Sequence, residues 1–179
     1  MGVQLEESRL FTLYFADDQV VLAEDREDLS YMVRKLKEEY ELNGLVLNVG
    51  KCEYLVVGSD IVENLPLEDG EVKGVRRAKY LGVIFDKSGS SGVEVEERIQ
   101  KGRKVTRAFN SVWWDRGVSK KTKKRIYKSM VQSVVLYGSE VWELKQRNTG
   151  KLLATEMDVL RRSCRKRRLD RVRNEDIRR

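Results

Sequence analysis

The most constraining feature of this sequence is a change of hydrophobic period at the stretch DKSGSSG, residues 86–92. Before it, short runs of β-branched and aromatic residues are separated by turn residues, a pattern typical of strands. After it, apolar residues recur at a spacing of three and four, which is typical of amphipathic helices. Because this is the only Gly/Ser-rich stretch, we take it as the boundary between two subdomains and predict an α+β fold.

The first subdomain is predicted to contain β-hairpins and one packed helix. LFTLYF and QVVLA flank Phe15-Ala16-Asp17-Asp18 and predict a hairpin with both carboxylates at its turn. The next helix is expected to begin after Asp25, an N-cap residue, and to end at Asn43-Gly44. LVLNVGKCEYLVVG predicts two short strands around Gly50-Lys51, and EVKGVRRAKYLGVIF predicts a second pair with a tight link near Arg76-Arg77.

The second subdomain is predicted to be helical. One apolar helix face extends from Val95 to Trp113, Ser119 can cap a second helix, and a third helix carries the apolar residues between Leu153 and Leu160. Residues 164–179 contain too few apolar side chains to pack by themselves. We therefore expect them to form a flexible basic tail.

Charge is divided unevenly between the two parts of the chain. Residues 1–97 hold 11 Lys and Arg against 21 Asp and Glu, whereas residues 98–179 hold 25 against 8. The last 19 residues alone hold ten basic residues against three acidic ones. Such clusters usually mark contacts with nucleic acid or with the nuclear-import machinery. The alternative for the middle helices is a solvated helical face.

Composition excludes several classes of function. The chain has no histidine, and its two cysteines, Cys52 and Cys164, are far apart in sequence, so a structural zinc site and a histidine-dependent catalytic triad are excluded. The cysteine usage fits a reducing compartment. No apolar run approaches the roughly 18 residues of a membrane span, and the start has no signal-peptide pattern. We therefore expect an intracellular protein with no membrane partner.

Asp17 and Asp18 are the polar residues that most need an explanation, because two adjacent carboxylates at a hairpin tip repel each other. A bound dication would remove this electrostatic penalty. Such a carboxylate pair is a candidate site for Mg²⁺, which binds carboxylate oxygens together with substrate phosphates. Aspartate is also common in ordinary turns, so a solvated turn is the alternative interpretation.

Five stretches, in this order, resemble the reverse transcriptases of non-LTR (LINE-type) retrotransposons. They are LYFADDQVVLAEDREDL, GLVLNVGKCEYLVVG, AKYLGVIFDKSG, SKKTKKRIYKSMVQSVVLYGSEVW and DRVRNEDIRR, and they extend over nearly the whole chain. The resemblance implies a partial polymerase palm over residues 1–87, made of antiparallel β-hairpins with one packed helix. It also implies a helical thumb-like region over residues 93–163. The implied activity is that of an RNA-directed DNA polymerase, a magnesium-dependent nucleotidyltransferase of a transposable element.

The resemblance assigns catalytic roles to three residues. Phe15-Ala16-Asp17-Asp18 is similar to the Tyr/Phe-x-Asp-Asp signature of the polymerase palm, which makes Asp17 the main Mg²⁺ ligand and Asp18 a secondary carboxylate. Phe15 is expected to border the primer end. Lys51 matches the lysine of the family's Asn-x-x-Lys segment and is expected to neutralise or protonate the leaving pyrophosphate. An exposed turn lysine is the alternative for Lys51.

The resemblance also implies which residues contact the duplex of RNA template and DNA primer. One such segment, Tyr80-Leu81-Gly82, resembles the primer-grip hairpin. Glycine at this position permits close approach of a nucleic-acid backbone. The alternative interpretation is a core strand with a bulge. The basic face of the thumb is expected to hold the duplex through its phosphates. This face includes Arg103, Lys104, Arg107, Lys120, Lys121, Lys123, Lys124 and Arg125.

Three tryptophans and one cysteine have competing interpretations. Trp113 lies on the apolar helix face and is predicted to pack in the core, whereas Trp114 and Trp142 can stack on bases. Cys52 lies in a predicted strand and is expected to act as a small hydrophobic residue rather than as a reactive thiol.

The sequence departs from the family in what precedes the hairpin. Another catalytic aspartate of such polymerases comes from an upstream strand, and the fingers also lie upstream, but only a short segment precedes the hairpin here. We therefore expect Mg²⁺ binding to be weak or absent and the chain alone to be inactive as a polymerase. We also expect an open sheet edge with an exposed apolar face, and an N-terminal polymerase half as a partner.

The main interpretation is thus a fragment of a retrotransposon-derived reverse transcriptase, located in a nuclear or cytoplasmic ribonucleoprotein. Nucleotides are its only expected small-molecule substrates. One alternative is a non-catalytic nucleic-acid-binding protein derived from such an element, whose basic half is functional. Another is an α+β domain whose charges only keep it in solution.

Overall fold

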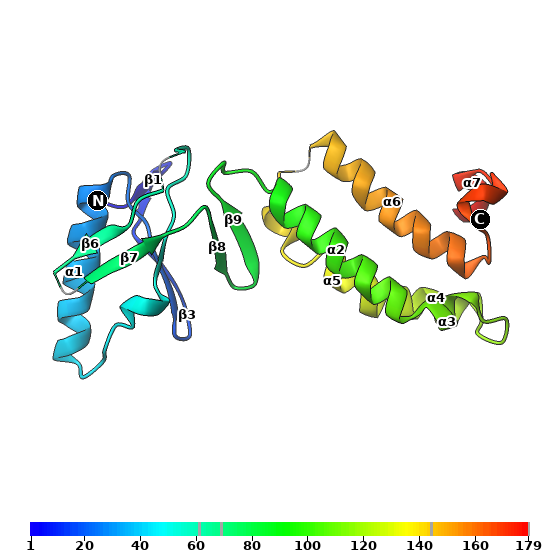
Figure 1. Cartoon of the computed structure of the whole chain (residues 1–179), viewed down its shortest axis with the longest axis horizontal. Coiled ribbons are helices and arrows are strands. Elements are labelled where there is room, and N and C mark those ends of the chain that lie inside the picture. The colour runs from blue at the N-terminus through cyan, green and yellow to red at the C-terminus, as the bar shows by residue number, and fades with distance from the viewer. Residues whose placement is uncertain (61, 69, 144, 179) are drawn as a thin grey trace. The chain divides into compact units, whose positions relative to one another are not determined.

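The computed structural model describes residues 1–60, 62–68, 70–143 and 145–178 of the chain (Figure 1). The chain divides into two compact units, Met1–Ser90 and Ser91–Arg179, and the division falls inside the Gly/Ser-rich stretch. Strands and one long helix form the first unit, and helices form the second, so the fold is mixed α+β. Each unit is described by itself below.

The first unit, here called the β unit, contains four small sheets. Strands β1 and β2 form one antiparallel pair, β3 and β4 a second, and β8 and β9 a third. In the fourth sheet β7 lies in the middle, parallel to β5 and antiparallel to β6. The bounds are β1 Val3–Leu5, β2 Ser8–Leu10, β3 Thr12–Phe15, β4 Asp18–Val21, β5 Glu53–Tyr54, β6 Leu65–Leu67, β7 Gly70–Gly74, β8 Arg77–Tyr80 and β9 Val83–Asp86.

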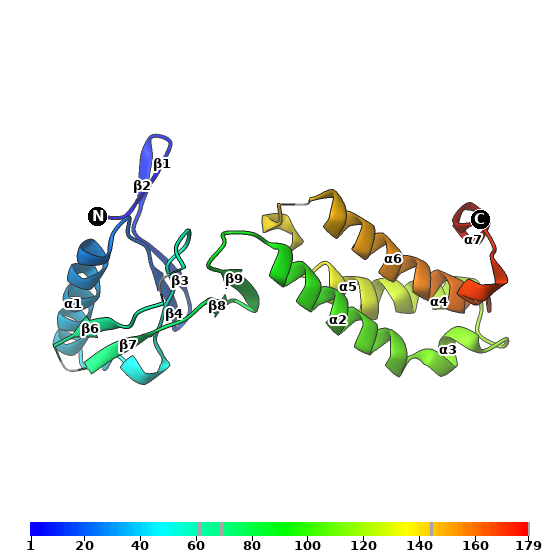
Figure 2. The same cartoon turned by 45° about the horizontal axis from the view of Figure 1, so that its top comes forward.

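Helix α1, Arg26–Leu42, packs against β4 and β6, and Figures 1 and 2 show β6 alongside the helix. The predicted N-cap is confirmed, because the Asp25 carboxylate accepts a hydrogen bond of 2.7 Å from the backbone N–H of Asp28. The predicted end is also confirmed, since Asn43 is the C-cap and Gly44 follows with a φ of +73°. Arg26 fixes the start of the helix to the segment before β6 through an ion pair of 2.6 Å with Glu63.

Two predictions about strands in the β unit are wrong. Residues 45–48 form no strand, and a short 3₁₀ helix, η1 (Val49–Lys51), precedes β5. Their apolar side chains indicated a strand, but Leu45 and Val46 are exposed, and β5 pairs instead with β7 from later in the chain. Similarly, the tight turn that joins paired strands lies at Leu81-Gly82, not near Arg76-Arg77.

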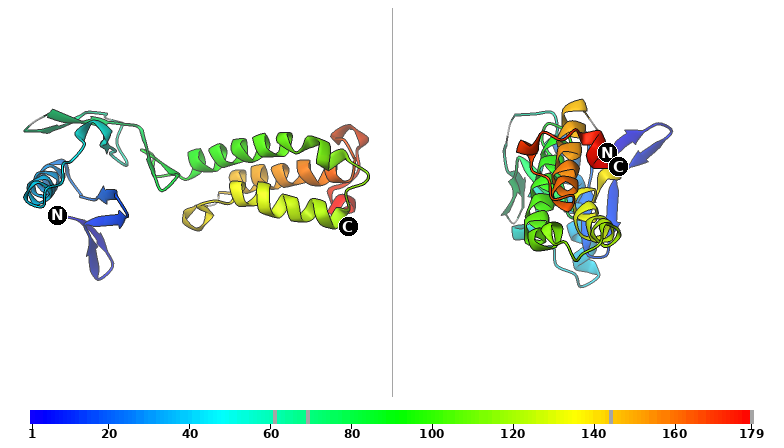
Figure 3. Two further views of the ribbon diagram at one scale, coloured as in Figure 1. Left: turned by 90° about the horizontal axis from the view of Figure 1, so that it is seen from below. Right: turned by 90° about the vertical axis from the view of Figure 1, so that its right-hand side faces the viewer.

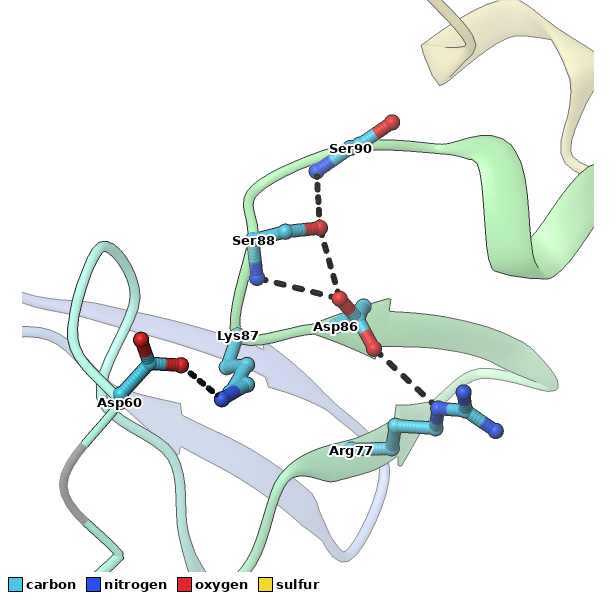
Figure 4. A network of polar contacts seen from close by, with 6 residues as sticks. All are labelled: Asp60, Arg77, Asp86, Lys87, Ser88 and Ser90. Carbon is cyan, nitrogen blue, oxygen red and sulfur yellow. Dashed lines mark hydrogen bonds and ion pairs between the residues drawn. The ribbon is translucent and has the colours of Figure 1, made fainter.

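The end of β9 is held by a polar network that is drawn in Figure 4. Asp86 accepts hydrogen bonds from the Ser88 hydroxyl at 2.6 Å and the Ser88 N–H at 3.1 Å, and it pairs with Arg77 across the hairpin at 3.1 Å. Lys87 forms an ion pair with Asp60. The hydrogen bonds from Ser88, followed by the pair with Arg77, lower the pKa of Asp86. This network gives the start of the Gly/Ser-rich stretch a defined conformation.

The second unit, here called the helical unit, packs three long helical segments side by side (Figure 3). The second of these is a continuous run in which a π-helical segment, η2, joins α4 to α5. The bounds are α2 Gly92–Ala108, α3 Asn110–Trp114, α4 Lys120–Ile126, η2 Tyr127–Gln132, α5 Ser133–Val135, η3 Ser139–Val141 and α6 Gln146–Ser163. In the described part of the chain, no helix combines the length and the apolar character needed to cross a bilayer.

The core of the helical unit consists of Trp113, Val131, Val135 and Val159. The prediction for Trp113 is confirmed, because its side chain is 0% exposed and its indole N–H donates to the Thr106 carbonyl at 2.9 Å. The predicted cap is confirmed as well, since the Ser119 hydroxyl accepts from the Thr122 N–H at the start of α4. These contacts hold the helices in a bundle that is packed around Trp113.

Residues 164–178 contain two short helices, and the expected flexibility of this tail stays a prediction. The helices are η4 (Arg168–Asp170) and α7 (Asn174–Arg178), and Ile177 is buried. The Arg161 guanidinium on α6 donates to the Val172 carbonyl at 2.7 Å. The tail is too polar to form a core of its own, but α6 supplies the apolar and hydrogen-bonding partners that it lacks.

Candidate functional site

The two aspartates lie at the tip of the β3–β4 hairpin, as the sequence predicts. Phe15 pairs with Asp18, so Ala16 and Asp17 form a two-residue turn. Ala16 has a φ of +52°, a backbone conformation that non-glycine residues seldom adopt. Both carboxylates are exposed to solvent. The hairpin thus presents two negative charges on a tightly turned backbone.

The two faces of this hairpin have different surroundings. Directly paired residues of antiparallel strands share a face, so Tyr14 and Gln19 lie on one side and Phe15 and Asp18 on the other. Gln19 accepts a hydrogen bond from the Tyr40 hydroxyl of α1, and burial raises the pKa of that hydroxyl. The Gln19 face therefore packs on α1, and Asp18 points away from the helix.

The face that carries Asp18 is apolar and uncovered. Phe11, Leu13 and Phe15 alternate along this side of the hairpin and are 46%, 41% and 63% exposed. Within the described ranges, β3 and β4 pair only with each other, so both outer edges of this sheet are unpaired. The open edge and exposed apolar face that the sequence predicts are present in the structure.

The described residues provide only part of a magnesium site. Mg²⁺ requires near-octahedral coordination by oxygen and commonly takes one or two carboxylates together with water and phosphate oxygens. Asp17 and Asp18 fit that role as a pair. No group of three or more acidic, cysteine or histidine side chains suited to a metal occurs among the described residues. A magnesium ion bound by this pair would take its further oxygen ligands from outside the described residues, for example from water or phosphates.

Lys51 lies at the end of η1 and is exposed. No hydrogen bond or ion pair among the described residues connects it to Asp17 or Asp18, so its predicted catalytic role stays a prediction. Its neighbour Cys52 donates to the Asn48 carbonyl at 3.4 Å, and burial raises the pKa of this thiol. A raised pKa leaves less thiolate at neutral pH, which agrees with the expected non-reactive role.

Tyr80, Leu81 and Gly82 occupy the tip of the β8–β9 hairpin. Leu81 and Gly82 are the two central residues of its turn, with φ values of +48° and +82°. A turn with positive φ at both central positions matches the twist of a hairpin and favours glycine. The turn geometry therefore accounts for Gly82 by itself, without a bulge in a core strand. Close approach of nucleic acid to this tip stays a prediction.

Most of the predicted phosphate-binding cations are exposed on the helical unit. On α2 the exposed cations are Arg103, Lys104 and Arg107, and on α4 they are Lys120, Lys121, Lys124 and Arg125. Arg103 also lies near Glu96, whose pKa is lowered mainly by its hydrogen bond from Lys151. The solvent-facing sides of two helices are thus strongly cationic.

Lys123 is the exception, and the prediction that it binds nucleic acid is corrected here. Its side chain is 4% exposed, and its ammonium donates to the carbonyls of Trp113 and Asp115 at 2.7 Å and of Ser163 at 3.5 Å. These carbonyls are at the ends of α3 and α6, where backbone acceptors lack partners within their own helix. Lys123 is a capping residue and is unavailable to phosphates.

Sequence reasoning missed the place where the tail meets α3. The Arg167 guanidinium lies over the Trp114 ring at 6.0 Å from the ring centre. Lys123 ties the ends of α3 and α6 together at the same place. The signals in the sequence were a tryptophan and a basic run, but nothing local indicated that they meet.

The comparisons with known proteins provide one distant match. The chain is 26% identical over 159 residues to an uncharacterized transposon-derived protein of Caenorhabditis elegans. The match covers 86% of this chain and 56% of the relative, so the chain spans about half the length of the curated relative it matches. No protein-family model matches, and no solved structure matches. This similarity supports a transposon origin for the chain.

Proposed function

We propose that the chain is the palm-and-thumb part of a retrotransposon-derived reverse transcriptase, whose helical unit binds the duplex of RNA template and DNA primer. The observation that carries the proposal is the combination, in one transposon-like chain, of an exposed aspartate pair on a hairpin tip with a strongly cationic helical unit. Neither feature is specific alone, but a polymerase requires both.

In this proposal Asp17 and Asp18 hold Mg²⁺ at the primer terminus. When bound, the ion neutralises charge on the phosphates of the incoming nucleotide. Phe15 shares a face with Asp18 and is 63% exposed, so its ring is available to pack against the last primer nucleotide. Lys51 supplies a positive charge for the leaving pyrophosphate, and its exposure leaves its ammonium accessible.

The proposed duplex contacts lie on α2 and α4 and on the β8–β9 tip. Exposed Lys and Arg side chains bind phosphates without reading base sequence, which is what a polymerase needs from surfaces that hold any template. The set consists of the cations named above without Lys123. Tyr80 and Gly82 add a turn that can lie along the primer backbone.

The chain alone is expected to be inactive as a polymerase. Two carboxylates provide only a few of the ligands that two metal ions need. In the described residues, no third acidic group lies with them. We propose that a further polymerase segment, on the same or another polypeptide, completes the centre. The assembled enzyme would act in a nuclear or cytoplasmic ribonucleoprotein.

Primer extension tests this proposal. The chain is incubated with Mg²⁺, nucleotides and a DNA primer on an RNA template, and the same reaction is run with an added polypeptide that carries a complementary polymerase segment. We expect no extension by the chain alone and extension in the complemented reaction that is lost in Asp17→Asn. Extension that survives this substitution would contradict the assignment of the aspartates.

A non-catalytic nucleic-acid-binding protein is the second candidate. The observation that favours it is the incomplete carboxylate set, because a retained binding protein needs no metal centre. It predicts the same duplex affinity as the first candidate but no extension in any complemented reaction. Asp17→Asn is then expected to leave every measured property of the chain unchanged.

A further inference from the structure

We infer that the corner of the helical unit, residues 114–121 together with 164–171, is a separate binding site for single-stranded nucleic acid. The inference goes beyond the duplex surface proposed for α2 and α4, with which the corner shares Lys120 and Lys121, and it rests on the proposed function only in taking nucleic acid as the polyanion. Figures 1 and 2 both place the α3–α4 turn and the end of α6 at the same end of the bundle.

Two segments distant in sequence join at this corner. Lys123 bonds to carbonyls at the ends of both α3 and α6, and the Arg167 guanidinium lies over the Trp114 ring. The buried ammonium and the aromatic contact fix the start of the tail against the α3–α4 turn. The exposed side chains of both segments are therefore held on one surface rather than on a loose chain.

The corner carries a large excess of positive charge. Exposed cations come from Arg116, Lys120 and Lys121 on one segment and from the run RKRR at 165–168 on the other. Its two acids are used locally, because Asp115 accepts from the Gly117 N–H at 2.6 Å and Asp170 from the Arg167 N–H at 2.8 Å. These two carboxylates keep their negative charge, but the exposed cations outnumber them, so a polyanion is the matching ligand.

The planar groups favour a single strand over a duplex. Unpaired bases stack on aromatic rings and on guanidinium planes, whereas the bases of a duplex are already stacked on one another. Arg167 over Trp114 supplies a guanidinium group on an aromatic support. Leu169 beside it is 88% exposed and adds an apolar contact for a base or a sugar.

The scaffold beneath the corner is already folded, which reduces the entropic cost of binding. Arg161 holds the tail through the Val172 carbonyl at 2.7 Å and Asn174 at 2.9 Å, and Arg178 pairs with Glu156 at 3.2 Å. Ile177 is buried next to α6. The run 165–168 therefore lies between two anchored points.

The test compares two matched triple variants of the full chain. Arg116→Gln, Lys166→Gln and Arg168→Gln form the corner variant, and Arg103→Gln, Lys104→Gln and Arg107→Gln form the α2 variant. Each removes three exposed cations, so both lose the same net charge. Labelled oligouridine is the single-stranded probe and an RNA–DNA hybrid is the duplex probe. Circular dichroism confirms that both variants stay folded.

We expect the corner variant to lose about tenfold in affinity for oligouridine and much less for the hybrid. The α2 variant is expected to show the reverse order. Equal losses for both variants on oligouridine, or no loss in the corner variant, overturn the inference. A corner-specific loss combined with no hybrid binding by the unmodified chain leaves the inference standing and contradicts the proposed function.

Arg167→Lys separates stacking from charge. The substitution keeps the positive charge but removes the guanidinium plane over Trp114. We expect about a threefold loss in oligouridine affinity with an unchanged salt dependence, because stacking contributes without releasing counter-ions. An affinity equal to that of the unmodified chain shows that only charge acts at the corner, and that result also overturns the inference.

Discussion

The ammonium of Lys123 donates a hydrogen bond of 2.7 Å to the carbonyl oxygen of Trp113, and both side chains are buried. This bond joins α4 to the end of α3, and two further carbonyls complete the coordination of the ammonium. The sequence predicts an exposed side chain for Lys123, because it lies within the run KKTKKR. In the structure it is the central polar link of the corner.

Lys123→Met is expected to destabilise the helical unit by about 2–3 kcal/mol, because one buried and two partly buried hydrogen bonds from its ammonium to backbone carbonyls are lost. All three tryptophans lie in the helical unit, so denaturant unfolding followed by tryptophan fluorescence reports on this unit. The matched control is Lys121→Met at an exposed position of the same helix, where a change below about 0.5 kcal/mol is expected. Equal effects of the two substitutions would refute the capping role.

Two helical glycines predict opposite responses to alanine. A Cβ on Gly102 would overlap Cγ2 of Val135, whereas a Cβ on Gly150 meets no atom within 4 Å. Gly102→Ala is expected to cost about 1–3 kcal/mol, since valine is stiff and the site is packed. Gly150→Ala is expected to stabilise by about 1 kcal/mol through helix propensity. Fluorescence-monitored unfolding checks both, and stabilisation by Gly102→Ala would show that α2 and α5 are not in close contact.

The Asp86 network predicts a dependence of the β unit on pH. Because the folded-state pKa of Asp86 is lowered, mainly by Ser88, the ionised form stabilises the fold. This contribution is present above the ordinary pKa of about 4 and is lost as pH falls through the lowered value. We expect about 1–2 kcal/mol at neutral pH, and none of this contribution in Asp86→Asn.

The measurement is amide hydrogen exchange of the β8–β9 hairpin as a function of pH, together with the NMR shift of the Ser88 amide. In the unmodified chain, the Ser88 amide donates to Asp86 and its shift should titrate below pH 4. Ser90→Ala, which leaves both Asp86 contacts in place, is the control. A Ser88 shift that titrates at the ordinary pKa of aspartate would show that the network is absent in solution.

Magnesium binding by the hairpin is expected to be weak, with a dissociation constant of about a millimolar or weaker, because only two carboxylates face the ion. Mn²⁺ as a paramagnetic probe should broaden the NMR signals of residues 14–19 first. Asp17→Asn should abolish this selectivity, whereas Glu24→Gln, a change at another exposed acid of the β unit, should not. Broadening spread evenly over the acidic residues would indicate non-specific binding.

Local features of this chain are readable from its sequence, and non-local ones are not. The caps Asp25 and Ser119 and the buried Trp113 follow from patterns within one or two helical turns. The burial of Lys123 and the Arg167–Trp114 contact depend on how α3, α6 and the tail pack together, and no local pattern encodes that packing.

The candidate site shows the same division. The aspartate hairpin follows from its flanking apolar runs, and its uncovered face was expected from the family resemblance. Of the two strands expected around Gly50-Lys51, the first does not form, because a strand needs a partner and the second, β5, pairs with β7 instead. An apolar run identifies a segment that can pair, but the sequence does not say with which other segment.

The central claim is that the exposed cations of the helical unit bind a template–primer duplex, and the affinity for a labelled RNA–DNA hybrid as a function of salt tests it most directly. Between about 50 and 200 mM salt we expect log affinity to fall linearly with log salt, with a slope of about −4 or steeper. Neutralising Arg103, Lys104 and Arg107 should reduce the magnitude of that slope by about 2–3. Undetectable binding at low salt, or a slope that these three substitutions leave unchanged, would contradict the account.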